Sequence, residues 1–454
     1  MSRGWVRLQA VVVSGSVAEG LMLSVLPWIA ATITSDPRQL SLVNVVGQSP
    51  WLLFSLVAGV LIDRVRRSAM LTWAYAVQGC AALSIAVAGV TDALSLPLLV
   101  VVAFVVTSAQ VLGDGTTGAL VPEVVEQGRL AAANTRLIVI DRGVVQFAVP
   151  PVAGFLVAFG LGTPAWVAVV AAVVALLLVR GLRSARVSGA VSGAGTVSGA
   201  GAGAGEASAK KHPLRDIGEG LRFLVRTRLL LSITVAVALG SFAASATMSM
   251  FVLYAKELLG LGAVGYGVMQ AAMAAGWVAS SFVVARVVHR LGYAWSMRLA
   301  QVGMVVTVAL FVVLPPWAWA IGAVMFVQSA IVMVWNVCSQ SSRQLFTPSA
   351  LLGRVLTSHR ALAWGLTPLG ALAGGFVAAG FGLRAVWVMA AVIQVGALIT
   401  AWRGLSPRAF REAELVAAGE VKSGEDQGQG QGQGKGKGKG KGKGKGKGQE
   451  VGHA

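Results

Sequence analysis

The stretch Gly59-Val60-Leu61-Ile62-Asp63-Arg64-Val65-Arg66-Arg67 links two long apolar runs through a short basic loop. The runs cover residues 41–62 and 69–90, and each is about as long as the ~20 apolar residues that cross a bilayer core as a helix. Lys and Arg are enriched in the cytoplasmic loops of membrane proteins. The stretch therefore predicts a tight hairpin of two membrane-spanning helices whose loop lies on the inner side.

The composition of the whole chain agrees with a membrane location. Of 454 residues, 56 % are hydrophobic and only 12 % are charged, and the mean hydropathy is +0.75. A soluble protein of this size cannot bury so much apolar side chain, because its surface remains large. The net charge of +19 is compatible with nucleic-acid binding, but such proteins do not carry so many apolar residues. We therefore expect an integral membrane protein with no nucleic-acid partner.

Catalytic and cofactor chemistry has no support in the sequence. Cys80 and Cys338 both lie within apolar runs, which indicates packing rather than a disulfide framework or a metal site. The four histidines lack the spacing of metal ligands, and there is no Walker A motif. We expect no cofactor, no metal and no enzymatic activity, because no embedded His, Cys or Ser constellation suits catalysis.

Apolar runs of membrane-spanning length recur along the chain. The twelve predicted spans cover residues 8–32, 41–62, 69–90, 95–117, 138–160, 164–180, 229–254, 264–286, 294–314, 317–341, 360–380 and 384–403. An even number of spans places both termini on one side of the membrane. The loops between spans on that side carry twenty Lys and Arg, whereas the opposite loops carry Arg38, Lys256 and Arg384. The bias predicts that both termini are cytoplasmic, in a multi-pass protein of the cell inner (plasma) membrane.

The chain divides into two halves of six spans. We predict an N-terminal half (1–183), a cytoplasmic linker (184–228) and a C-terminal half (229–404). The linker is rich in Gly, Ala and Ser, and ends in an amphipathic helix at about 213–226 that we expect to lie along the inner membrane surface. Residues 405–454 form a basic, Gly- and Lys-rich tail that we expect to be disordered. The tail either attaches loosely to anionic lipid or is a dispensable extension.

A weak internal repeat supports the division into halves. Its matching residues are separated by 218 positions: Arg136 with Arg354, Arg142 with Arg360, and Pro150 with Pro368. Six spans followed by six related spans predict an all-α membrane protein with two pseudo-symmetric halves. Residues 150–154, in the fifth predicted span, contain Pro and Gly. These residues serve either close helix packing or a hinge for motion.

The loop at 59–67 resembles the inner-loop signature of major facilitator superfamily transporters. It has a glycine four residues before Asp63-Arg64, followed by a basic cluster, although Arg66 stands where the family usually has Gly. The resemblance implies a twelve-helix fold that works by alternating access. It also implies an inner gate, which we assign to Gly59, Asp63, Arg64, Arg67, Asp114 and Arg354. The alternative is that this loop carries only the ordinary basic charge of an inner loop, and that Asp114 is simply solvated.

Three further stretches resemble the drug- and siderophore-exporter branch of that superfamily, which includes enterobactin and macrolide exporters. They are Ala119–Glu123 followed by Ala133–Leu137, then Gly262–Gly267, and last the series from Arg343 to Gly375. This likeness implies export of a small organic molecule, and it does not identify the substrate.

Acids inside the predicted spans are few and therefore informative. Of the eighteen Asp and Glu, only Glu19, Asp114 and Asp141 lie within spans. A charge at the middle of a span costs on the order of 3 kcal/mol, so Glu19 should be protonated, paired or exposed to a wet cavity. We expect a role in proton coupling or cation binding, with a structural pair as the alternative. Asp141 and its neighbour Arg142 are further candidates, and Arg142 either reaches the cavity or extends to the inner headgroups.

Amides and two tryptophans complete the candidate site. Amides are costly in lipid unless they face protein or water, and in the resembling superfamily the spans that carry them line the central cavity. The candidate cavity residues are Gln48, Gln110, Gln146, Gln270, Gln328, Trp335, Asn336 and Trp364. The alternative for each is an interhelical hydrogen bond or simple packing.

These features predict a proton-coupled exporter of a drug, siderophore or secondary metabolite, acting as a monomer. An importer of the same fold is the first alternative. A membrane receptor or scaffold without transport, acting through the basic tail, is the second.

Overall fold

The computed structural model describes residues 3–54, 65–125, 130–181 and 221–415. Within these ranges every regular element is a helix, as the apolar runs predict. The first half contains α1 (Arg3–Ile33), α2 (Pro37–Phe54), α4 (Arg67–Val90), α5 (Leu96–Val124), α6 (Leu130–Gly143), η2 (Val144–Ala148), α7 (Val149–Val157) and α8 (Thr163–Val179). The second half contains α10 (Arg228–Leu253), η3 (Tyr254–Leu258), α11 (Ala263–Ser281), α12 (Val284–Val313), α13 (Ala318–Leu345), α14 (Ser349–Gly365), α15 (Thr367–Phe381) and α16 (Leu383–Trp402).

The helices have the dimensions of membrane spans. Seven of the described helices are long and apolar enough to cross a bilayer, and α8 and α15 are shorter apolar helices. The remaining predicted spans correspond to α2, to α11 and to the interrupted α6–η2–α7 segment. Several helices continue beyond the predicted spans. For example, α5 ends at Val124 rather than near residue 117.

Two predicted spans are broken, each for a local cause, and one helix is kinked between two predicted spans. The fifth span contains a π-helical turn, η2, just before Pro150 and Pro151, which have no N–H and crowd the preceding turn. The eleventh span divides at Leu366, just before Pro368 in the first turn of α15. A kink within α12 lies at Gly292, whose φ of 71° is accessible to glycine without a steric penalty.

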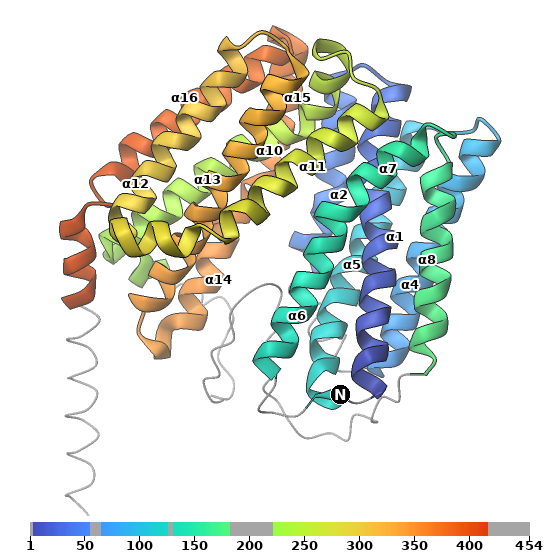
Figure 1. The fold of residues 1–454 in the computed structure, drawn as a ribbon, viewed down its shortest axis with the longest axis horizontal. Helices are drawn as coiled ribbons and strands as arrows, with labels where there is room; N and C mark the ends of the chain where they lie inside the picture. Colours follow the sequence, from blue (N-terminus) through green and yellow to red (C-terminus); the bar gives the residue numbers. More distant parts are fainter. Residues whose placement is uncertain (1–2, 55–64, 126–129, 182–220, 416–454) are drawn as a thin grey trace, which may run out of the picture.

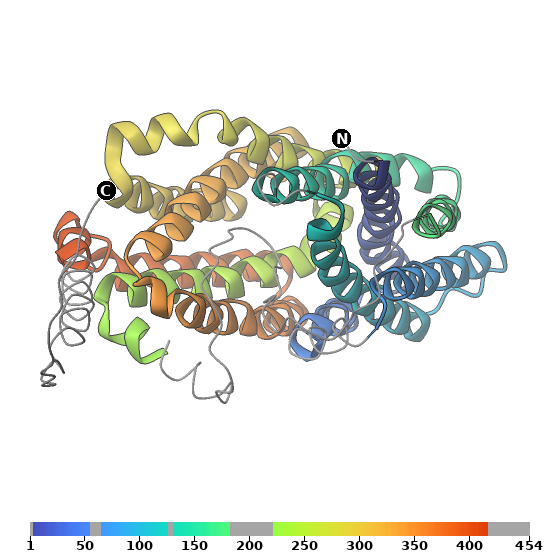
Figure 2. The ribbon, with the colours of Figure 1, turned by 90° about the horizontal axis from the view of Figure 1, so that it is seen from below.

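The two halves lie side by side and lean together at one end (Figure 1). This end, which we call the closed end, contains the end of α1, the start of α2, the end of α15 and the start of α11. From it the ribbons of α6 and α14 diverge toward the end where α1 begins. Figure 2, seen from below, shows the N-terminal and C-terminal helices as two separate groups. The largest cluster of buried hydrophobic residues spans both groups, because Trp28 and Ile29 belong to it together with Tyr254.

Two peripheral segments lie partly within the described residues. The predicted linker helix is helical over 221–226, where Leu224 is buried against Leu230 and Val355, and its earlier part lies outside the described residues. The segment predicted to be disordered begins with a helix over 407–415. Phe410 packs edge-on against Phe346 with ring centroids 5.7 Å apart, so an apolar face attaches the start of this segment to the C-terminal half.

Candidate functional site

The candidate site centres on Glu19, near the middle of α1. Its side chain is only 7 % exposed, and Gln110 of α5 donates a hydrogen bond from Nε2 to Oε1 of Glu19. An amide N–H can donate to either a carboxylate or a protonated carboxyl oxygen. Gln110 can therefore hold Glu19 in both protonation states.

Two further acids lie near Glu19, around one tyrosine. Ser16, one turn earlier on α1, donates to Oδ1 of Asp141 of α6 over 2.6 Å. Tyr75 of α4 is buried, shares a hydrogen bond with Thr117, and lies close enough to Asp114, Glu19 and Asp141 to feel their charges. All three acids that the sequence placed within spans thus lie close enough to one phenol group to act on it electrostatically. We call these side chains, together with Ser16, Gln110 and Thr117, the acid cluster.

Small residues on α1 allow this cluster to assemble. A Cβ added at Gly15 would lie 2.7 Å from the Tyr75 hydroxyl, and one at Gly20 would lie 3.2 Å from the Val145 backbone in η2. Only glycine lets the Tyr75 ring and the π-helical turn approach α1 so closely. The sequence Ala18-Glu19-Gly20 therefore places an acid directly beside a close helix–helix contact.

The C-terminal half contains a related arrangement without the acids. Thr234 of α10 donates to the Leu230 carbonyl at 2.8 Å, which leaves its oxygen free to accept from Nδ1 of His359 at 2.9 Å. Arg343 of α13 contacts the other ring nitrogen, Nε2, of the buried His359. His359 thus lies between a hydroxyl group of α10 and a guanidinium group of α13.

The two arrangements occupy equivalent positions. Ser16 and Thr234 are separated by 218 residues, as are Asp141 and His359, and each hydrogen-bonded pair spans 125 residues. The same offset relates Gln110 to Gln328 and Tyr75 to Tyr293. The offset of 218 residues also relates Glu19 to Val237, and Val237 packs against an apolar cluster. The polar frame is thus repeated in both halves, whereas Glu19 has no acidic counterpart.

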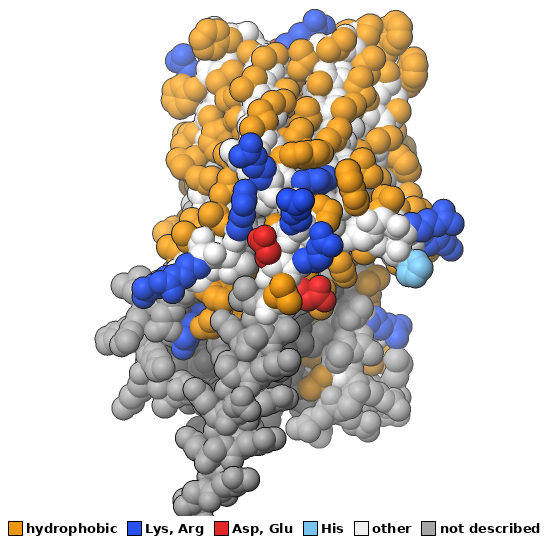
Figure 3. Space-filling model, turned by 90° about the vertical axis from the view of Figure 1, so that its left-hand side faces the viewer, with side chains coloured by type: hydrophobic (Ala, Val, Ile, Leu, Met, Phe, Trp, Pro, Cys, Tyr) orange, Lys and Arg blue, Asp and Glu red, His pale blue; other side chains and the backbone are white. Residues whose placement is uncertain are grey.

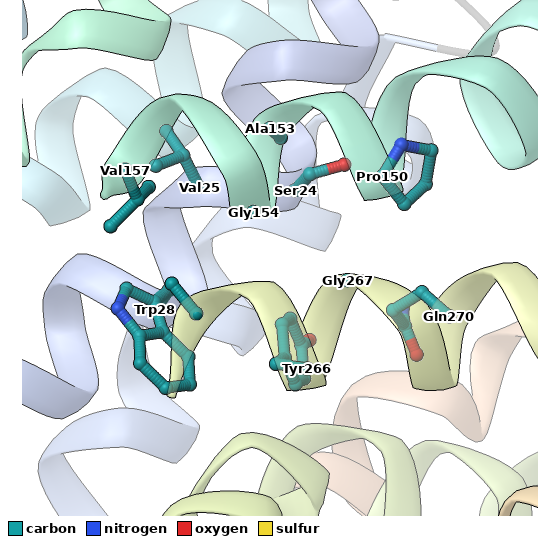
Figure 4. A pocket seen from close by; sticks show the side chains of 11 residues that line it. Ser24, Val25, Trp28, Pro150, Ala153, Gly154, Val157, Tyr266, Gly267 and Gln270 are labelled. Atoms are coloured by element: carbon teal, nitrogen blue, oxygen red, sulfur yellow. The ribbon is translucent and has the colours of Figure 1, made fainter. Parts of the chain in front are cut away.

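Close backbone contacts join the two halves at the closed end (Figure 4). A Cβ at Gly267 of α11 would lie 2.7 Å from the Pro150 carbonyl of α7, and one at Gly154 would lie 2.5 Å from the Ala263 carbonyl. Trp28 and Tyr266 face each other across the same narrow pocket with ring centroids 5.6 Å apart. Residues 150–154 therefore serve helix packing in this conformation.

Two cations strengthen the closed end. Lys256 of η3 donates to the carbonyl of Ala31 at 2.5 Å, near the end of α1. Carbonyls in the last turn of a helix lack intrahelical partners and attract cations. Arg38 of α2 lies 5.7 Å from the ring centroid of Phe376 in α15. Arg38 and Lys256 are again 218 residues apart, so each half contributes an equivalent cation to the other.

The predicted cavity residues fall in different environments. Gln270 lines the pocket at the closed end, and its Oε1 is buried without a hydrogen-bond partner among the described residues. Gln48 and Gln328 are half-buried, and Asn336 is exposed. Trp335 is only 4 % exposed within an apolar cluster, so this conformation favours packing over stacking on a substrate. The side chains of Gln146, Trp364 and Arg142 lie outside the described residues.

The predicted inner gate is described only in part, because Gly59, Asp63 and Arg64 lie outside the described residues. Arg67 donates from Nη1 to the carbonyl of Ala119 over 2.7 Å, which joins the start of α4 to α5. Asp114 is half-buried and acts electrostatically on Tyr75, and Arg354 is half-buried in α14. A gate composed of these residues remains a prediction.

Several residues of the site were not identified from the sequence. Ser16, Tyr75, Thr117 and Lys256 contribute side chains to the site, and none is unusual within its apolar run. The repeat of 218 residues was the available signal, because it pairs Ser16 with Thr234 and Tyr75 with Tyr293. Among the described residues, no group of three or more His, Cys, Asp or Glu is placed to hold a metal ion.

Comparison with protein families gives one match. The family described as Major Facilitator Superfamily matches residues 10–368. No curated protein sequence matches the chain.

Comparison with solved structures gives many matches that share the fold. A bacterial homologue of the iron transporter ferroportin in an inward-facing state has a TM-score of 0.71 at 16 % identity, covering 89 % of this chain and 100 % of that one. A bacterial homologue of ferroportin in an outward-facing state has a TM-score of 0.55 at 15 % identity, covering 88 % of this chain and 99 % of that one. The nucleoside transporter NupG has a TM-score of 0.64 at 12 % identity, covering 88 % and 99 %. These likenesses confirm the predicted all-helical fold.

Proposed function

The chain belongs to the major facilitator superfamily, and from this premise we propose that it is a proton-coupled exporter of a small organic molecule. Family and fold point to a multi-pass membrane transporter rather than an enzyme. Export, proton coupling, a drug- or siderophore-like substrate and action as a monomer are the parts that we add. So is the location in the cell inner (plasma) membrane with both termini cytoplasmic.

The distribution of basic residues supports an orientation of the protein in the membrane. Arg38 and Lys256 lie at the closed end, whereas the loops predicted on the other side carry twenty Lys and Arg. Since Lys and Arg favour cytoplasmic loops, the closed end is the outer end, and this conformation opens to the cytoplasm. In such a state an exporter would take up its substrate.

Burial of Glu19 beside Gln110 is the observation that carries proton coupling. A carboxyl that is 7 % exposed at mid-span is stable when neutral, and it ionises only when water or a cation reaches it. Asp141 and Tyr75 offer further hydrogen-bonding groups nearby. In our proposal Glu19 binds a proton in one conformation and releases it in the other, so that each substrate exported is exchanged for protons entering.

The contacts at the closed end support alternating access. Gly154, Gly267 and the facing rings of Trp28 and Tyr266 hold the outer end shut. Opening them while the inner ends of the halves meet would expose a midplane site to the other side, as in other transporters with repeated halves. The polar residues Gln48, Gln270, Gln328 and Asn336 are our candidates for contact with the substrate.

The cargo of the structural neighbours does not transfer to this chain. The neighbours include iron, metal and nucleoside transporters, but identities of 11–16 % support the shared fold alone. The resemblance of the sequence to drug and siderophore exporters is therefore the support for an organic cargo.

Transport into everted membrane vesicles tests the proposal. Respiring vesicles that contain the protein should accumulate a lipophilic fluorescent cation such as ethidium, and a protonophore should collapse the accumulation. Glu19→Gln should reduce the gradient-driven rate at least tenfold, because an amide cannot exchange a proton. Glu257→Gln is the matched control, since Glu257 is exposed at the closed end.

Three outcomes count against the proposal. Wild-type transport by Glu19→Gln would exclude Glu19 as the coupling site. Accumulation that persists with the protonophore would exclude the proton gradient as the driving force. Net loss of dye from the vesicles on energisation would indicate an importer.

A further inference from the structure

Arg298, on the cytoplasmic side of α12 in the proposed orientation, lies between two indole rings. Its Cζ is 5.5 Å from the ring centroid of Trp295 and 4.5 Å from that of Trp402, the last residue of α16. Nη2 donates to the Trp402 carbonyl over 2.8 Å, which fixes the guanidinium between α12 and α16. Tryptophan is enriched at the level of lipid headgroups, so this arginine is held at that level.

The guanidinium retains hydrogen-bonding capacity. Arg has five N–H donors, and the bond to the Trp402 carbonyl uses one of them. Its Nε is buried without an acceptor among the described residues, so the Nη groups are the donors that a ligand would meet. A planar fork of donors suits the paired oxygens of a phosphate group, and guanidinium sheds its hydration more readily than an ammonium group.

Apolar side chains extend from this arginine along both helices. Along α12, exposed residues recur at intervals of four and three positions, which places them on one face: Trp295, Leu299, Val302 and Val306. The same spacing occurs along α16 in Val388, Val392, Val395, Ile399 and Trp402. The helices pack against each other, and both stripes end in a Trp beside Arg298. Together they form an apolar surface long enough to accommodate acyl chains.

Basic residues surround the headgroup end of this surface. Exposed arginines follow α16 at Arg403, Arg408 and Arg411, and Arg286 and Arg290 precede Arg298 on α12. Figure 3 shows the Lys and Arg side chains on this side of the molecule gathered in a band directly below the apolar wall, among few acids. The positive excess favours an anionic ligand over a zwitterionic one.

We propose that the surface formed by Arg298, Trp295, Trp402 and the two apolar stripes is a binding site for an anionic phospholipid of the inner leaflet. Arg298 binds the phosphate between the two indoles, Arg403 faces the remaining negative charge, and the acyl chains lie along α12 and α16. Occupation joins α12 to α16, two helices of the half that moves as a unit in alternating access. The site does not depend on the cargo or on proton coupling.

Native mass spectrometry of the purified full-length chain tests this proposal. At limiting lipid, the wild-type protein should retain one phosphatidylglycerol at least about fivefold more tightly than phosphatidylcholine, since each basic residue near a headgroup adds comparable affinity. Arg298→Gln should reduce retention of phosphatidylglycerol to that of phosphatidylcholine. Arg384→Gln is the matched control, because Arg384 is exposed at the opposite end of α16 and should keep the preference.

Two further variants separate charge from geometry. Arg298→Lys keeps the charge but loses the fork and should show an intermediate preference, and Trp295→Leu keeps apolar area but should weaken retention. Equal retention of the two lipids by the wild type would overturn the site, as would equal loss in Arg298→Gln and Arg384→Gln. Displacement of phosphatidylglycerol by inorganic phosphate at the same concentration would also overturn it, because the ligand would then be a free anion.

Discussion

The two halves of the transporter share a polar frame but differ in its chemistry. In the N-terminal half Ser16 bonds to Asp141, and Gln110 bonds to Glu19. At the equivalent places in the C-terminal half Thr234 bonds to His359, and Val237 replaces Glu19. Residues 229–404 contain one acid, the exposed Glu257. The two halves keep the same helices and equivalent hydroxyl groups, so they keep the same fold. They differ at a few residues, and these differences place the candidate proton-binding acids in the N-terminal half alone.

The largest expected effect comes from adding the missing acid. Val237→Glu places a carboxyl against an apolar cluster and should destabilise the protein by about 3 kcal/mol. Thermal unfolding in detergent measures this, with Val237→Gln as the neutral control of the same shape. A Glu variant as stable as the Gln variant would show that the C-terminal half accepts an acid here, and that the two halves differ less than we infer.

Removal of His359 should rank next. His359→Leu takes one partner from Thr234 and one from Arg343, and should cost about 2–3 kcal/mol because the group left behind at Arg343 is charged. At the equivalent place Asp141→Asn keeps an acceptor for Ser16 and should cost less than about 1 kcal/mol. Unfolding midpoints of the two variants give the comparison, and a larger cost for Asp141→Asn would reverse the ranking.

The equivalent tyrosines should respond unequally. Tyr75→Phe removes a buried hydroxyl that shares a hydrogen bond with Thr117 and should cost about 1 kcal/mol. Tyr293 is half-buried, so Tyr293→Phe should stay within about 0.5 kcal/mol of the wild type. Both are measured by thermal unfolding, and equal costs would mean that the acid cluster does not depend on the Tyr75 hydroxyl.

The smallest effects should come from the two cations at the closed end. Lys256→Met removes a hydrogen bond to the last turn of α1 and should favour opening of the closed end by about 1 kcal/mol. Arg38→Met removes an exposed cation–π contact and should favour opening by about 0.5 kcal/mol. Distances between spin labels on α2 and α15 measure the open fraction. A larger increase of the open fraction in Arg38→Met than in Lys256→Met would show that the Arg38 contact stabilises the closed end more than the Lys256 contact does.

Much of the fold follows from local sequence, and the failures have local causes as well. Long apolar runs predict α4, α10 and α16 closely, because a bilayer leaves a helix few alternatives. The turn η2 and the break at Leu366 arise from prolines whose effect on the helix depends on neighbouring packing. The helix at 407–415 was missed, since its few apolar residues gain stability only by contact with Phe346.

The candidate site is less predictable than the fold. Glu19, Asp114 and Asp141 could be identified because acids within predicted spans are few. An acid within a span is costly and needs a partner. The partners themselves, Gln110, Ser16 and Tyr75, come from other helices, and the spacing within one helix carries no information about them. Trp335 shows the same limit, since its burial in an apolar cluster depends on α12 and α10.

The sequence by itself predicted twelve membrane spans, two repeated halves, and the side of the membrane on which most of the positive charge lies. These properties depend on hydropathy and charge summed over many residues, and such sums need no knowledge of contacts. Only the tertiary structure decided that the three acids meet around Tyr75, that the halves close through Gly154 and Gly267, and that Arg298 lies between two tryptophans. Each of these depends on atoms within a few ångströms that come from distant parts of the chain, and packing alone brings them together.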